Sequence, residues 1–274
     1  MDVKIFPNWS RPGVGAKPRS ERQRPLLPQH ARHCPVLEAG NAMGFLVYPP
    51  LEQHEAFQVE YHGDGRYQFQ YFLRMPDGKW KTIFTCTWTL PVGSIGAIQE
   101  EVEFGVPDPP VSKEGAAKMA GTFVVRQDLG TPAGAVTLRG AWNFQTPPGW
   151  DTVYFPVLNM IERPVAPALV VRVETDWYPH DTEIRYVLQP GEGLPGARHM
   201  AIGQALFVPR EEVNLVECTE EEIEKLREEK DEFLQKKADE RRTTPYGLEY
   251  SPHYIRRSRE VNQEQRKRAD PAPE

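Results

Sequence analysis

Proline is spread along this chain at a density that argues against long helices as its main architecture. Twenty-seven of the 274 residues are proline, roughly twice the usual share of about 5%. A proline inside a helix removes an amide donor and clashes with the preceding turn. The sequence therefore favours short strands joined by turns.

Alternating segments separated by turn residues predict an antiparallel all-β domain. Residues 57–61 and 67–72 alternate apolar and polar side chains, and the His-Gly-Asp-Gly sequence between them is typical of a hairpin turn. Residues 83–90 give the clearest strand pattern, with Phe84, Cys86, Trp88 and Leu90 on one face. Further strands are expected at residues 42–50, 121–126, 134–139, 168–174, 183–188 and 201–209, and loops at 91–121 and 191–196. Short strands at these intervals predict a β-sandwich or jelly roll over residues 34–215.

The two ends of the chain differ from this body. Residues 1–33 hold five prolines, and seven lysines and arginines against two acidic residues, so we expect an extended proline-rich basic arm. A capping box, Thr219-x-x-Glu222, predicts a helix within residues 216–243. Residues 244–274 are expected to form an extended tail. Because the whole chain carries a net charge of -6, basic ends on an acidic body suggest contact with an acidic partner, the alternative being solvated ends.

Several common classes of protein lack support in the sequence. The three cysteines are widely spaced and form no C-x-x-C pair, which favours a reducing compartment and argues against disulfides or structural zinc. No apolar run approaches the roughly 18 residues that span a membrane, and no charged-then-apolar leader opens the chain. Nucleotide-binding, serine-hydrolase and zinc-protease motifs are also missing. We expect a cytoplasmic protein without a membrane segment or a cofactor.

Aromatic and acidic residues gather around residues 146–178. They could form a stacking wall for a sugar, a base or a proline-rich peptide, or they could fill the core. The basic ends lack interleaved aromatic residues, which argues against sequence-specific recognition of nucleic acid. Arginines of the N-terminal arm are instead expected to contact a protein. The predicted binding residues are Trp150, Glu174, Asp176, Trp177, Arg19, Arg22 and Arg24.

A non-haem iron site is the sharpest enzymatic alternative, because such sites use two histidines and one carboxylate on a β-barrel. His62 and Asp64 have the required His-x-Asp spacing, and His180 or His199 would supply the third ligand. Arg210 would then hold an oxoacid. The same His-Gly-Asp-Gly sequence is also typical of a plain hairpin turn.

Three motifs together resemble a family of uncharacterised bacterial and phage proteins, grouped as a domain of unknown function. They are Ala-x-Gly-Phe-x-Val-x-Pro-Pro at residues 42–50, Thr-Pro-Pro-Gly-Trp at 146–150 and Glu-Thr-Asp-Trp-x-Pro at 174–179. Residues 203–209 resemble the closing strand of that family, but Gln204-Ala205 departs from its more usual Gly-Glu-Pro. The resemblance covers roughly residues 34–215 and implies a compact all-β domain without a known activity.

These observations favour a non-catalytic structural or accessory protein over an enzyme. Its arms would strap it onto a larger protein assembly, either a protein partner or copies of itself. The phage members of the similar family suggest a virion as one such assembly. The alternative is a cupin-like non-haem iron oxygenase.

Overall fold

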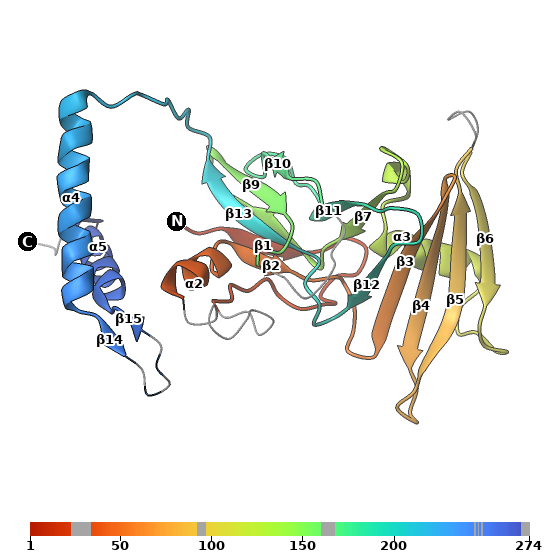
Figure 1. The fold of residues 1–274 in the computed structure, drawn as a ribbon. Helices are drawn as coiled ribbons and strands as arrows, with labels where there is room; N and C mark the ends of the chain where they lie inside the picture. The colour runs from red at the N-terminus through yellow and green to blue at the C-terminus, as the bar shows by residue number, and fades with distance from the viewer. Residues whose placement is uncertain are drawn as a thin grey trace, which may run out of the picture. The chain divides into compact units, whose positions relative to one another are not determined.

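The computed structural model describes residues 1–22, 34–91, 97–159, 168–243, 245, 247 and 249–269, with side chains described as far as residue 265 (Figure 1). The chain divides into two compact units, Met1–Glu211 and Glu212–Glu274. Every strand pair among the described residues is antiparallel. The prediction of a β-rich antiparallel fold followed by a C-terminal helix is therefore confirmed.

A five-stranded sheet forms one part of the first unit (Figure 1). Its strands, in spatial order, are β12 (Gly193–Ala197), β3 (Glu55–Gly63), β4 (Arg66–Arg74), β5 (Trp80–Thr89) and β6 (Gln99–Phe104). The predicted β3–β4 hairpin is present, with Tyr61 opposite Tyr67. Asp64 adopts a φ of 49° in the turn, a conformation that aspartate tolerates better than most residues. The predicted apolar face of β5 is also present, because Phe84, Cys86 and Trp88 are buried.

The remaining strands of the first unit form a second group of smaller sheets. A four-stranded sheet has the order β10 (Val171–Val173), β9 (Trp150–Phe155), β13 (Gly203–Pro209) and β2 (Phe45–Val47). Two further pairs join β11 (Glu183–Val187) to β7 (Ala135–Arg139), and β1 (Lys4–Pro7) to β8 (Trp142–Gln145). The first unit also contains α2 (Pro35–Asn41) and the short 3-10 helix η2 (Arg126–Asp128).

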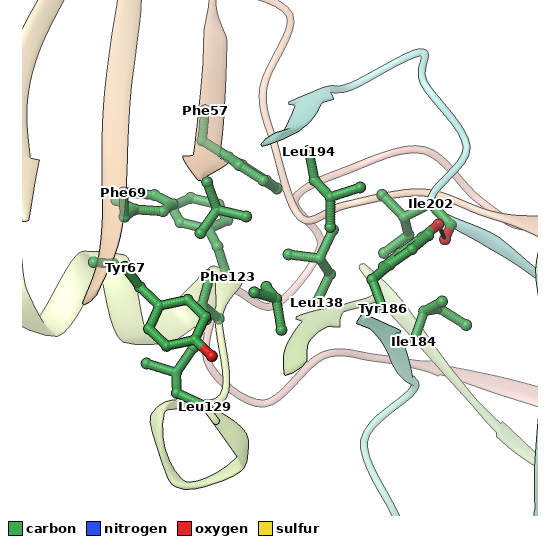
Figure 2. Packing of buried hydrophobic residues seen from close by; sticks show 14 of the residues in the cluster. Phe57, Tyr67, Phe69, Phe123, Leu129, Leu138, Ile184, Tyr186, Leu194 and Ile202 are labelled. Carbon is green, nitrogen blue, oxygen red and sulfur yellow. Dashed lines mark hydrogen bonds between the residues drawn. The ribbon is translucent and has the colours of Figure 1, made fainter. Parts of the chain in front are cut away.

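The core is rich in aromatic rings, which come from both groups of strands and from a helix. Phe123 lies 5.4 Å from Phe57 and 5.8 Å from Phe69 between ring centroids. Figure 2 shows these rings on one side and Leu138 and Tyr186, from β7 and β11, on the other. The two groups of strands therefore share one buried cluster.

The sequence analysis was wrong about the segment that supplies Phe123. It predicted a loop over residues 91–121 and a strand over 121–126, whereas helix α3 spans Lys113–Phe123. The Ser112 hydroxyl accepts a hydrogen bond from the Gly115 amide at 3.1 Å and caps the helix. Ala116, Ala120 and Phe123 are its buried residues, and their spacing of four and three places them on one face.

Two other local predictions were also wrong. Residues 191–196 were expected to be a loop, but β12 occupies most of them and pairs with β3. Residues 168–174 were expected to be a buried strand, yet only Val171–Val173 form β10, at the edge of its sheet. Leu169 and Val170, which precede β10, and Val171 at its start are exposed.

The N-terminal segment is the main correction to the domain boundaries. Residues 1–33 were expected to extend away from the body, but residues 4–7 form β1, which pairs with β8, and the first unit begins at Met1. Asn8 is fully buried, and its side-chain amide donates to the Gly140 carbonyl at 2.9 Å. Arg11 binds the buried Glu55 through two hydrogen bonds of 2.9 Å. Residues 23–33 of the predicted arm lie outside the described residues.

The second unit contains α4 (Glu220–Asp239), β14 (Arg242–Thr243), β15 (Glu249–Tyr250) and α5 (His253–Ala269). The predicted capping box is confirmed, since Thr219 and Glu222 bond each other's backbone amides. The extended tail predicted for residues 244–274 is wrong over 253–269, which form α5. Neither α4, α5 nor any other helix in the described ranges is long and apolar enough to cross a membrane.

Candidate functional site

The best-formed candidate site is a pocket of about 560 Å³ in the first unit, which we call the aromatic groove. It combines the N-terminal segment, the end of β8 and the loop after β10. The lining residues are Phe6, Pro7, Asn8, Trp9, Pro12, Phe144, Gln145, Thr175, Asp176, Trp177 and Pro179. Trp9 and Trp177 are each 65% exposed. Two large indoles left in solvent beside one pocket are unusual, because aromatic side chains normally bury most of their surface.

The first wall of the groove is held by Asn8. Its backbone amide donates to the Ala141 carbonyl at 2.9 Å, in continuation of the β1–β8 pair. Its side-chain oxygen accepts from the amides of Ser10 and Arg11 at 2.7 and 3.2 Å. These two bonds hold residues 8–11 in a turn. The Trp9 ring lies 5.3 Å from the Phe6 ring between centroids.

The opposite wall is held by a cluster of buried threonines. The Thr175 hydroxyl lies 2.9 Å from that of Thr146 and 2.7 Å from that of Thr152. Thr146 also donates to the Trp150 carbonyl at 2.6 Å. These bonds tie the loop of Trp177 to the Thr-Pro-Pro-Gly-Trp turn and to β9. The loop is therefore positioned by buried polar contacts, which are costly to break.

Charged groups fix the same loop from its other side. One oxygen of Asp176 accepts from the Gly149 amide at 2.9 Å, and the other accepts from Arg210 at 2.7 Å. Arg210 also donates to the buried Asp151 at 2.9 and 2.6 Å. Arg172 of β10 binds the second oxygen of Asp151 at 2.6 Å. The ends of β9, β10 and β13 and the groove loop thus share one network of ion pairs.

The network shifts the pKa values of its members. The hydrogen bond from the Gly149 amide, with support from Arg210, lowers the pKa of Asp176. The hydrogen bond from Arg210 lowers the pKa of Asp151 against the opposing effect of burial. The same two carboxylates raise the pKa of Arg210. All three groups therefore stay charged at neutral pH, and Asp176 is suited to holding the loop and poorly suited to accepting a proton in catalysis.

The sequence predicted part of this site. Asp176 and Trp177 line the aromatic groove, as expected for a binding surface. Glu174 is exposed and lies 3.7 Å from the Arg210 guanidinium. Trp150 is half-buried at the start of β9 and is not among the groove-lining residues. Ligand binding by these four residues is still a prediction.

The predicted binding arginines lie elsewhere. Arg19 lies over the Tyr48 ring at 5.4 Å, pairs with Glu21 and lines a smaller pocket of about 340 Å³. Arg22 is exposed, and its carbonyl accepts from the Asn41 side chain at 2.8 Å. Arg24 lies outside the described residues. Among the groove residues that were not predicted, Phe6 and Trp9 belong to the segment expected to have no fold.

The predicted iron ligands are not brought together. His62 lies 3.6 Å from Glu60, and His180 lies 3.7 Å from Glu183. His199 lines the pocket of Arg19, and Arg210 is engaged by the carboxylates described above. No group of three histidine, cysteine, aspartate or glutamate side chains suited to a metal ion occurs among the described residues, which include all the predicted ligands.

Comparison of the chain with known protein families, with characterised proteins and with solved structures gives no match. The resemblance to the family of bacterial and phage proteins therefore stays a prediction.

Proposed function

We propose that this is a non-catalytic accessory protein that binds an extended, proline-containing segment of a protein partner in the aromatic groove. The observation that carries this proposal is the pair of exposed indoles, Trp9 and Trp177, at one apolar groove. Extended proline-rich segments dock onto grooves lined by aromatic rings, because they lose little conformational entropy on binding. Exposed tryptophans are also among the residues that contribute most to protein interfaces.

The polar groups of the groove favour a peptide over a sugar. Recognition of a sugar needs several free hydrogen-bonding groups beside the aromatic face. Asn8, Thr175 and Asp176 already bond other parts of the protein. Gln145, which is exposed at the end of β8 and lines the groove, would donate a hydrogen bond to a ligand carbonyl. A ligand with few polar groups per unit length matches this lining.

Attachment to a larger protein assembly, for example a virion, is still proposed, but it would occur through the aromatic groove and not through loose arms. The sequence analysis expected loose arms to strap the protein to its partner. The described part of the N-terminal segment instead forms one wall of a groove, so attachment would occur through a preformed site on the first unit. A β-sandwich or jelly-roll scaffold for this unit is part of the same proposal. A preformed groove costs less ordering entropy on binding than a loose arm does.

The test is selection of peptide ligands from a display library by the full-length protein, followed by fluorescence titration of the best binder. We expect proline-rich ligands. Trp9→Ala and Trp177→Ala should each raise Kd by about tenfold or more, since a loss of about 1.4 kcal/mol is tenfold in affinity.

Trp80→Ala is the matched control, because Trp80 is 48% exposed on β5 and does not line the groove. This variant should bind like the wild type. Selection of no peptide, or equal weakening by all three substitutions, would contradict the proposal. Thermal unfolding of each variant would verify that the fold is retained.

A further inference from the structure

A second pocket of the first unit gathers cationic and aromatic side chains around a volume of about 340 Å³. We call it the arginine pocket. The residues of its lining that bear on ligand binding are Arg19, Arg198, His199, Tyr48, Trp80 and Glu55. None of them lines the aromatic groove, so the two sites are distinct. A pocket of this volume holds a small ligand.

Arg198 and His199 occupy the two middle positions of a turn that follows β12. The turn is closed by a hydrogen bond of 2.9 Å from the Met200 amide to the Ala197 carbonyl. Among the residues that the structure describes, neither side chain has an ion-pair or hydrogen-bond partner. The Arg198 Nε atom is moreover buried. A buried donor without a partner is costly, so a ligand that brings an acceptor to Arg198 would be bound favourably.

Arg19 supplies the second guanidinium of the pocket. Its backbone carbonyl accepts from the Leu46 amide at 2.8 Å, which ties residue 19 to β2. Its guanidinium lies 5.4 Å from the centre of the Tyr48 ring, an arrangement in which the ring stabilises the cation. Glu21 pairs with Arg19 at 2.5 Å, but the Arg19 side chain is still 63% exposed. Because a guanidinium has five N–H donors, Arg19 can bind a ligand while it keeps this pair.

Acidic residues near the pocket do not cancel its positive charge. The lining includes the carboxylate of Glu55, but both of its oxygens accept from Arg11 at 2.9 Å. Glu21 in turn pairs with Arg19. Each of these acids is thus matched by one arginine, and the charge of Arg198 is left over. An unbalanced guanidinium at a pocket favours an anionic ligand.

Trp80 gives the pocket an apolar wall. It lies at the start of β5 and is 48% exposed, and flat rings pack well against an indole. Guanidinium groups bind carboxylates and phosphates through paired, charge-assisted hydrogen bonds. We propose that the arginine pocket binds a small ligand in which a phosphate or carboxylate group is joined to a flat ring. Arg198 and Arg19 would bind the oxyanion, and Trp80 would contact the ring.

Isothermal titration calorimetry of the full-length protein with phenyl phosphate, benzoate and inorganic phosphate tests this proposal. At least one of the two ring-containing ligands should bind with one-to-one stoichiometry, and the tighter of them identifies the preferred oxyanion. Arg198→Met should raise the Kd of that ligand by about tenfold or more, because it removes a charge-assisted bond. Arg66→Met is the matched control. It removes the same charge from an exposed position in the β3–β4 hairpin and should leave the Kd unchanged.

Trp80→Ala tests the contact with the ring. It should reduce the affinity for the ring-containing ligand to about that for inorganic phosphate, whereas Trp9→Ala and Trp177→Ala should have no effect, because they alter only the aromatic groove. Thermal unfolding of each variant would verify that the fold is retained. Lack of saturable binding by all three ligands, or equal weakening by Arg198→Met and Arg66→Met, would overturn the oxyanion site. An unchanged affinity in Trp80→Ala would overturn the contact between Trp80 and the ring.

Discussion

The contact between Arg11 and Glu55 gives the sharpest test of how the N-terminal segment is held. The Arg11 guanidinium binds both oxygens of Glu55 at 2.9 Å, and the two side chains are 18% and 6% exposed. Removal of one partner from a buried ion pair costs about 3–5 kcal/mol. Glu55 would keep the Tyr71 hydroxyl and the Glu52 amide as donors. Because these two donors remain, we expect Arg11→Met to lower the free energy of unfolding by about 3 kcal/mol, the lower end of that range.

Urea unfolding followed by tryptophan fluorescence measures this loss. With a slope of about 2–3 kcal/mol per molar urea, the midpoint should fall by about 1 M. Arg66→Met, at an exposed position in the β3–β4 hairpin, is the control and should change the midpoint little. In a Glu55→Gln background, Arg11→Met should cost much less, because the charge it would leave unpaired is gone. A fall of less than about 0.2 M for Arg11→Met would refute the view that this ion pair fixes the segment.

The same pair predicts a dependence on pH. Burial alone would raise the pKa of Glu55, but the hydrogen bonds from Arg11, the Glu52 amide and Tyr71 lower it below the ordinary carboxyl value. A carboxyl group with a lowered pKa in the folded state stabilises the protein above its unfolded pKa of about 4.3, and this stabilisation is lost as the pH falls through the folded pKa. The difference in stability between the wild type and Arg11→Met should therefore be largest near neutral pH and shrink below about pH 4.

Three further outcomes follow from local geometry. Thr219→Ala removes the cap of α4 and should cost about 1 kcal/mol of helix stability, visible as faster amide exchange in its first turn. Gly44→Ala should lower the urea midpoint of the first unit, since Gly44 has a φ of 68° and a β-carbon there would lie 2.1 Å from the Ala205 carbonyl oxygen. An unchanged midpoint would mean that β2 and β13 can move apart at this point without loss of stability. A glutamate-specific protease should cut the full-length protein first within residues 212–219, after Glu217 for example, because this stretch is exposed and has no helix or strand. Mass spectrometry of the first fragments would show whether cleavage begins elsewhere.

Local sequence signals sufficed where an element depends on its immediate neighbours. The β3–β4 hairpin follows from strict alternation on both sides of a turn rich in glycine. The N-terminus of α4 follows from Thr219 and Glu222 alone, because both partners of the capping box lie within one turn. Reliance on local signals also explains why helix α3 was not predicted. Gly115 and Gly121 lie within α3, and their low helix propensity hid a helix whose apolar face is stabilised by packing against the sheets.

Elements that depend on distant partners were beyond a local interpretation. Residues 4–7 are too few to show a convincing strand pattern, and their partner strand begins at residue 142. The sequence analysis therefore found one wall of the aromatic groove, through Asp176 and Trp177, and assigned the other wall to an arm without structure. The tail beyond residue 252 was misjudged for a different reason. Its helix α5 has little apolar content, so periodicity gave no signal.

The aromatic groove also imposes an order of events during synthesis. Asn8 and Gly140, which join the N-terminal segment to the sheet, are 132 positions apart. At a translation rate of about 5–20 residues per second, the first residues leave the ribosome about 7–26 s before their binding partner exists. Until then Phe6 and Trp9 belong to a loose basic chain end. A nascent or truncated chain that stops before residue 179 therefore has no complete groove. The first unit would become able to bind a partner only after β1 has paired with β8 and the loop of residues 175–179 has been made.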